Sequence, residues 1–141
     1  MKPRAGAWLA LAAAAILAIG VAAAQSPRAS LVQETARSWL AMTDRGDAAA
    51  SWQAAGPPFQ RAITPERWAE SLAQVRPPLG ALTGRAVQST EFRNTFPGAP
   101  DGDYAVVVFH TTFSKKAVAS EMVTLQREGD GTWRVIGYLI R

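Results

Sequence analysis

Three polar side chains in the C-terminal half of the chain are of types that can do acid–base chemistry. His110 is the only histidine, and an imidazole can gain or lose a proton near neutral pH. Glu121 shares its strand parity with apolar residues, and a carboxyl group held among them can act as an acid or a base. Tyr138 follows Gly137 and can present its hydroxyl to the same cavity. Together they are candidates for lining a ligand pocket.

Each of these residues also has a non-catalytic interpretation. A lone histidine at a strand end is usually half exposed or hydrogen-bonded, and Glu121 can pair with Arg85 or Arg93. A tyrosine in a terminal strand, here Tyr138, commonly covers the core. No serine stands in a nucleophile-elbow context, and a single histidine falls short of the ligand set of a zinc site. We therefore predict no catalytic residue, no cofactor and no metal ligand, and keep Glu121, Tyr138 and His110 as ligand-binding candidates.

The first 24 residues have the pattern of an export signal. Lys2 and Arg4 supply positive charge, and the run AGAWLALAAAAILAIGVAAA that follows is uncharged. Ala22 and Ala24 stand at the positions where signal peptidase requires small side chains. We expect cleavage between Ala24 and Gln25, and a mature chain in the periplasm or outside the cell. An uncleaved anchor is the alternative, because about twenty apolar residues can just span a bilayer.

The residues beyond this leader carry a nearly balanced charge. Two of the 15 Lys+Arg residues lie in the leader, so residues 25–141 hold 13 of them against 11 Asp+Glu, a formal net charge of +2. The positive residues stand singly apart from Lys115 and Lys116, which argues against nucleic-acid binding. The absence of cysteine excludes a disulfide scaffold and thiolate chemistry. A chain of this length forms one domain without covalent staples.

The elements that must position the candidate residues fall into two halves. Apolar residues at helical spacing, together with capping signals, predict three helices in the first half, which begin near Ser30, after Asp47 and after Thr64. A glycine and two prolines at 56–58 end the second helix, and two prolines at 77–78 end the third. The first half is therefore expected to be helical throughout.

The second half changes to the period of β-strands. Alternating or β-branched stretches predict strands at 82–96, 104–113, 117–128 and 132–141, with turn residues between them. Such short connections require antiparallel neighbours. The sequence thus predicts an α+β domain in which three N-terminal helices pack on one face of a curved four-stranded antiparallel sheet.

The strand predicted at 104–113 is apolar on both faces. One face carries Tyr104, Val106, Val108, His110 and Thr112, and the other carries Ala105, Val107, Phe109, Thr111 and Phe113. A strand with one wet face would show polar residues along it, so we expect this strand to be covered on both sides. A second subunit laid across the sheet is the simplest cover and predicts a two-fold homodimer.

Four stretches of the chain carry a resemblance to a known family: SWLAMTDRGDAAASWQAA, ERWAESLAQVRPPLG, PGAPDGDYAVVVFHTTF and WRVIGYLIR. They occur in order, with matching spacing, over nearly all of residues 34–141. The chain resembles the bacterial family catalogued as domain of unknown function 4019, and more broadly the nuclear-transport-factor-2-like superfamily with its cystatin-like α+β roll. The resemblance implies an exported roll domain behind a leader. It implies no reaction, so no catalytic residue is carried over.

Three functions from different classes fit these patterns. We favour a non-enzymatic exported module that binds a small apolar ligand or an envelope protein. The alternatives are a cofactor-independent isomerase, dehydratase or hydrolase that uses Glu121, His110 or Asp103, and a structural homodimer or envelope assembly factor. An open cavity with Glu121 buried beside Tyr138 would favour ligand binding or catalysis, whereas a concave face filled by side chains would favour the structural role.

Overall fold

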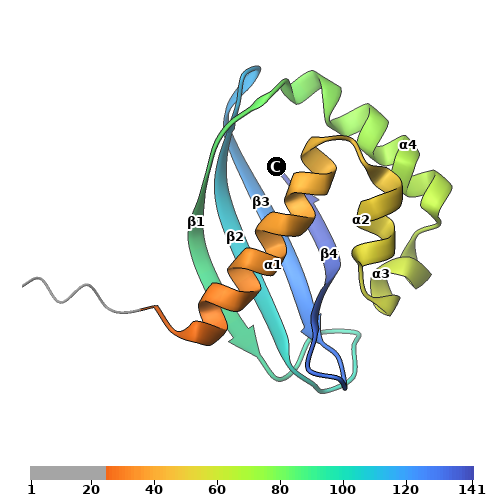
Figure 1. Ribbon diagram of the computed structural model, residues 1–141, viewed down its shortest axis with the longest axis vertical. Helices are drawn as coiled ribbons and strands as arrows, with labels where there is room; N and C mark the ends of the chain where they lie inside the picture. The colour runs from red at the N-terminus through yellow and green to blue at the C-terminus, as the bar shows by residue number, and fades with distance from the viewer. Residues whose placement is uncertain (1–24) are drawn as a thin grey trace, which may run out of the picture.

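The computed structural model describes residues 25–141, and the predicted leader lies outside the described residues (Figure 1). The described part has helices first and a sheet last, which confirms the α+β class. Its elements in chain order are α1 (Pro27–Asp44), α2 (Ala48–Ala54), α3 (Pro57–Ala62), α4 (Pro65–Val75), the 3-10 helix η1 (Pro77–Leu79), β1 (Leu82–Arg93), β2 (Tyr104–Phe113), β3 (Lys116–Arg127) and β4 (Trp133–Ile140).

The start of α1 is set by its capping residue. The Ser26 hydroxyl accepts a hydrogen bond from the Ala29 N–H at 3.1 Å, and Pro27 occupies the first helical position, where its missing N–H costs no hydrogen bond. The predicted start near Ser30 is therefore wrong, because Ser30 lies inside the helix. The apolar stripe that predicted the helix is unaffected, since it begins further along the chain.

A fourth helix, α3, follows the predicted break, so the expectation of three helices is wrong. Pro57–Pro58 occupy its first turn, where proline is tolerated. Gly56, just before them, donates its N–H to the Val135 carbonyl oxygen at 2.7 Å and ties this corner to β4. The other two predicted caps are confirmed, because Asp47 and Thr64 accept hydrogen bonds at the starts of α2 and α4.

The sheet has the strand order β1-β2-β3-β4 and is antiparallel throughout, as predicted. β1 ends at Arg93, three residues earlier than expected, and the chain then forms a loop of turns before β2. The register shifts between Val87 and Ser89, and again opposite Thr124 and Leu125. Such irregularities bend the strands and increase their twist, which curves the sheet around the helices.

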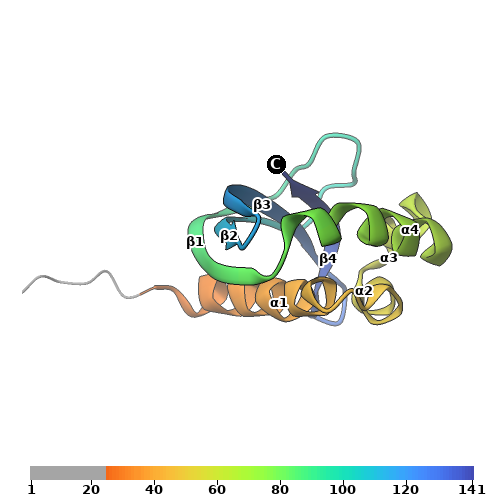
Figure 2. The ribbon, with the colours of Figure 1, turned by 90° about the horizontal axis from the view of Figure 1, so that it is seen from above.

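The helices pack against the inner face of the sheet, and α2, α3 and α4 stand on the side of β4 (Figures 1 and 2). Aromatic side chains fill the space between the two layers. The ring of Trp39 stacks on that of Trp68 with centroids 5.7 Å apart, and it meets Phe59 at 5.8 Å and Tyr138 at 5.4 Å, both edge to face. The concave face is thus occupied by core side chains.

The outer face of the sheet is covered at one end by the chain itself. Figure 2 shows the β1–β2 loop on the side of the sheet opposite α1. The Tyr104 hydroxyl donates to the Pro100 carbonyl oxygen at 2.5 Å, and the Phe96 ring lies 5.6 Å from the Tyr104 ring. Tyr104 and Val106 are consequently buried, whereas Val108 is half-buried and His110 is exposed. The predicted outer cover is therefore present over the start of β2, and it is a loop of the same chain.

Candidate functional site

Glu121 is the centre of a buried polar cluster. It lies on the inner face of β3, opposite Phe109 of β2 and Ile140 of β4, and its side chain is 0% exposed. Its neighbours on the same face, Ala119 and Val123, are buried and apolar. A carboxylate in such a place costs several kcal/mol to desolvate unless it is paired and hydrogen-bonded. The groups around Glu121 therefore decide what it can do.

Each of the other three strands sends one donor to the Glu121 carboxylate. Oε1 accepts from Arg85 Nε on β1 at 2.9 Å and from Thr111 Oγ1 on β2 at 2.6 Å. Oε2 accepts from the Tyr138 hydroxyl on β4 at 2.5 Å. Arg85 and Thr111 are partners in the β1–β2 register, so the sheet itself brings the two donors to the same oxygen. Arg85 is one of the two arginines that we expected beside Glu121, and the other, Arg93, pairs with Glu91.

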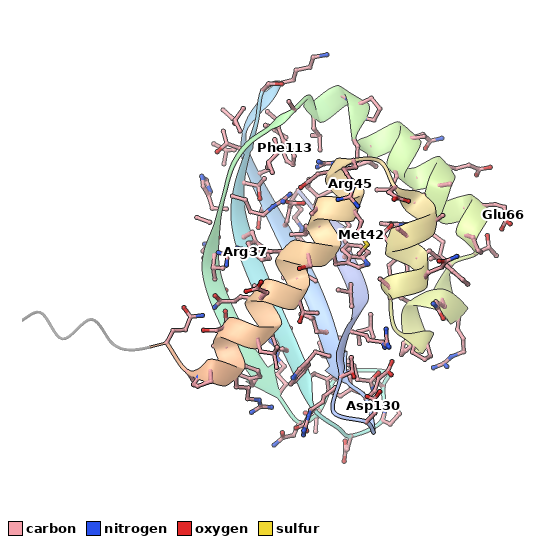
Figure 3. All side chains as sticks on the ribbon, in the orientation of Figure 1. Arg37, Met42, Arg45, Glu66, Phe113 and Asp130 are labelled. Atoms are coloured by element: carbon pink, nitrogen blue, oxygen red, sulfur yellow. The ribbon has the colours of Figure 1, made fainter. Side chains whose placement is uncertain are left out.

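A second carboxylate, that of Asp44 at the end of α1, joins the cluster to the helices. Arg85 Nη1 and Nη2 donate to its two oxygens at 2.8 and 2.9 Å. Arg76, which follows α4, donates through Nη2 to Asp44 Oδ1 at 2.6 Å. The guanidinium of Arg76 also lies over the ring of Phe113, which Figure 3 labels, at 4.6 Å from the centroid. We call Asp44, Arg76, Arg85, Glu121, Thr111 and Tyr138 the ionic cluster.

The electrostatics of the ionic cluster favour a fixed network over proton transfer. Burial opposes the charge of Arg85, but the hydrogen bond to Asp44 and the charges of Glu121 and Asp44 outweigh it and raise the pKa of Arg85. Burial first, and then the negative charge of Glu121, raise the pKa of Tyr138, so its phenol stays protonated and remains a donor. Two arginines balance two carboxylates. The arrangement can hold helices and strands together, and it leaves both oxygens of Glu121 occupied.

The three ligand-binding candidates do not share one pocket. Glu121 and Tyr138 meet through their hydrogen bond, whereas His110 lies exposed on the opposite face, in register with Ala86 and Ser120. Asp103, named in the enzymatic alternative, lies at the end of the β1–β2 loop and forms exposed ion pairs of 3.6 Å with two arginines, Arg28 and Arg127. The residues of that alternative are thus dispersed over three places.

Asp44 and Arg76 were missed by the sequence analysis. They are 32 residues apart, and Asp44 is 41 residues from Arg85, so no local spacing connects them. Both stand where a helix ends, Asp44 two residues before Gly46 and Arg76 directly before Pro77. A charged residue at such a corner is the only signal that the sequence offered, and it is shared by many exposed residues.

The open part of the outer face carries a row of apolar side chains across three strands. Val108 of β2 is paired with Met122 of β3, and Met122 is paired with Leu139 of β4. Met122 and Leu139 are 39% and 43% exposed. Polar side chains, His110 and Ser120, stand one residue pair further along the same face. We call Val108, Met122 and Leu139 the apolar row.

Within residues 25–141, no group of three or more His, Cys, Asp and Glu side chains is placed to hold a metal ion. None of the helices in that range is long and apolar enough to cross a membrane.

The comparisons with known proteins give one match. Residues 35–138 match the model of a family described as "Protein of unknown function (DUF4019)". No curated protein matches the chain, and no solved structure does. The match covers most of α1, the other helices and nearly the whole sheet. It includes every member of the ionic cluster and, from the apolar row, Val108 and Met122.

Proposed function

The chain belongs to the DUF4019 family of proteins of unknown function, and we propose that its mature form is an exported, non-enzymatic module that binds a protein partner through the outer face of its sheet. The leader pattern of residues 1–24 supports export and cleavage before Gln25. The order of helices and strands and the bent sheet support a cystatin-like roll of the nuclear-transport-factor-2-like type.

The observation that carries the proposal is the apolar row. Exposed apolar side chains scattered singly are ordinary, but neighbours that form a continuous patch with a polar rim favour a binding surface. Val108, Met122 and Leu139 are such neighbours, because each lies directly beside the next across the strands. β2 and β3 are the two central strands of the sheet, and α1 packs against their other face, so the apolar row is supported by the core.

The ionic cluster supports binding over catalysis. A general acid or base must reach a substrate atom, but the Glu121 carboxylate is fully buried and is bonded by Arg85, Thr111 and Tyr138. The core aromatic rings occupy the concave face in which a substrate or a small apolar ligand was expected. A partner on the outer face meets neither obstacle.

A second copy of the chain is the partner that suits this surface. The β1–β2 loop covers the start of β2, so the open part of the face, from Val108 to Phe113, is about 20 Å long, and four strands make it roughly 19 Å wide. An area of the order of 400 Å² is about half of the roughly 800 Å² that each partner gives to a standard interface. The apolar row is uncharged, so two copies related by a two-fold axis can bring it against itself without repulsion.

Light scattering on the mature chain, residues 25–141, tests this proposal. We expect a dimer at micromolar concentration and a monomer for Met122→Lys, which puts a charge in the apolar row. Leu31→Lys is the matched control, because Leu31 is 53% exposed on α1, away from the outer face. A monomeric wild-type chain at tens of micromolar would refute self-association. Mass spectrometry of the protein from a periplasmic extract tests export, with Gln25 as the expected first residue.

A further inference from the structure

The second half of β4 leaves backbone groups free at the edge of the sheet. β4 is the last strand in the sheet order, so one of its sides has no neighbouring strand. Arg141 and Ser120 exchange both of their backbone hydrogen bonds, at 3.0 Å each. Because inward and outward pairs alternate along an antiparallel ladder, Leu139 also bonds toward β3, whereas Tyr138 and Ile140 point their N–H and C=O groups away from it. No backbone hydrogen bond from another element of residues 25–141 reaches those outward groups.

The first half of the same edge is already closed by the chain itself. The Val135 carbonyl oxygen, which points outward, accepts the Gly56 N–H at 2.7 Å. The approach is close, because a Cβ atom on Gly56 would lie 3.1 Å from a side-chain carbon of Ile136. One side of β4 thus receives a backbone donor at Val135 but offers free donors and acceptors at Tyr138 and Ile140. The free stretch of the edge begins after Val135, the residue that Gly56 contacts.

An apolar groove accompanies the free stretch. It has a volume of about 200 Å³ and is bounded by α4 on one side and by the end of β4 on the other. Its lining residues are Trp68, Ser71, Leu72, Val75, Tyr138, Leu139 and Ile140. Val75 is 42% exposed and Leu139 is 43% exposed, although both are large apolar residues. Figures 1 and 2 both show α4 standing beyond β4, so the groove runs along the edge of the sheet.

We propose that this edge binds an extended apolar segment of another protein, which adds a fifth strand to the sheet beside Tyr138 and Ile140. Free N–H and C=O groups two residues apart match the repeat of an extended main chain. Every second side chain of that segment points into the groove, whose walls are mainly aliphatic and aromatic, so an aliphatic side chain suits it. This site goes beyond the proposed self-association, because it uses the edge of the sheet and α4 and shares only Leu139 with the apolar row.

The position of α4 argues for a single strand as the occupant. A second folded copy that paired its own β4 with this edge would bring its α4 against the α4 already standing there. An extended segment is only one strand wide. Its backbone would lie about 4.8 Å from the backbone of β4, the usual spacing of paired strands. The groove therefore selects a peptide segment over a complete sheet.

Nuclear magnetic resonance on the ¹⁵N-labelled mature chain tests the proposal. The probe is a capped six-residue peptide of alternating valine and threonine, and the control probe is the same peptide with every backbone nitrogen methylated. We expect the first peptide to shift the Tyr138 and Ile140 amide signals and to slow their hydrogen exchange about tenfold, which is the effect of new backbone hydrogen bonds. Equal binding of the methylated peptide, shifts confined to the apolar row, or no binding at millimolar concentration would overturn the proposal.

Two variants test the edge and the groove. Ile140→Pro removes an outward N–H, which an edge strand tolerates, together with an aliphatic side chain of the groove, and Val75→Asp places a charge in the groove without changing β4. Each is expected to weaken peptide binding about tenfold, while the melting temperature changes little. Leu31→Asp is the matched control for charge and is expected to bind as the wild type does. Unchanged binding by Val75→Asp, or an equal loss in Leu31→Asp, would contradict the site. The dimer measured by light scattering reports separately on the apolar row.

Discussion

The inner and outer faces of β2 and β3 carry their polar residues in opposite ways. Glu121, on the inner face, is fully buried and receives hydrogen bonds from three other strands. His110, on the outer face and within one residue pair of it, is exposed. Sequence parity separates the two residues, and burial then gives them different roles. The buried one holds the elements together, and the exposed one belongs to the rim of the proposed binding surface.

Removing Arg85 should lower the free energy of unfolding more than any other substitution described below. Arg85→Met deprives both Glu121 and Asp44 of their shared cation, and breaking a buried ion pair costs about 3–5 kcal/mol. Urea denaturation of the mature chain measures the loss. Arg93→Met is the matched control, because Arg93 pairs with Glu91 at the surface, and the denaturation midpoint should stay where it is. A similar midpoint for both variants would show that the ionic cluster does not stabilise the fold.

Tyr138→Phe should have an intermediate effect that depends on pH. Loss of its hydrogen bond to Glu121 is expected to cost about 1–2 kcal/mol at neutral pH. Burial raises the pKa of Tyr138 in the folded chain above its ordinary value near 10, so above pH ~10 the unfolded chain loses this proton first. The stabilisation that the protonated phenol gives below pH ~10 is therefore lost as the pH rises above that value.

Denaturation at several alkaline pH values measures this linkage. The free energy of unfolding of the wild type should fall faster between pH ~10 and 11 than that of Tyr138→Phe, by up to about 1.4 kcal/mol per pH unit for the one proton. Parallel curves for the two proteins would mean that the phenol is not held protonated by its surroundings.

His110→Ala should have the smallest effect. The side chain is exposed, and substitutions at such surface positions usually change stability by less than about 0.5 kcal/mol. Thermal unfolding of the variant should therefore match that of the wild type, in contrast to the two inner-face variants. A loss as large as that of Tyr138→Phe would contradict the distinction between the two faces.

The fold was predictable where the signals are local. The turn clusters and β-branched stretches placed β2 correctly from Tyr104 to Phe113, and the capping residues Asp47 and Thr64 placed two helix starts. The same kind of reasoning failed at Pro57–Pro58, because proline ends one helix and also suits the first turn of another. At the start of α1, the cap is Ser26, with Pro27 at the first helical position, a local signal that the prediction near Ser30 did not use.

The candidate site was predictable only in part. Strand parity singled out Glu121, since a carboxylate among alternating apolar residues needs a partner, and Arg85 was among the partners expected. Asp44 and Arg76 could not be found, because their contacts join residues 32 and 41 positions apart and depend on how α1 and α4 pack. His110 lies apart from Glu121 and Tyr138, because its pair with Ser120 places it on the opposite face of the sheet.

The three strands that donate to Glu121 also set an order on folding. Arg85, Thr111 and Tyr138 lie on β1, β2 and β4, so the carboxylate is fully compensated only when the last strand has joined the sheet. Until then, Oε1 is paired with Arg85 and Thr111, but the buried Oε2 lacks its donor, which is unfavourable. We therefore expect the ionic cluster to be completed late in folding, and contacts between residues so far apart in the chain favour slow, cooperative folding.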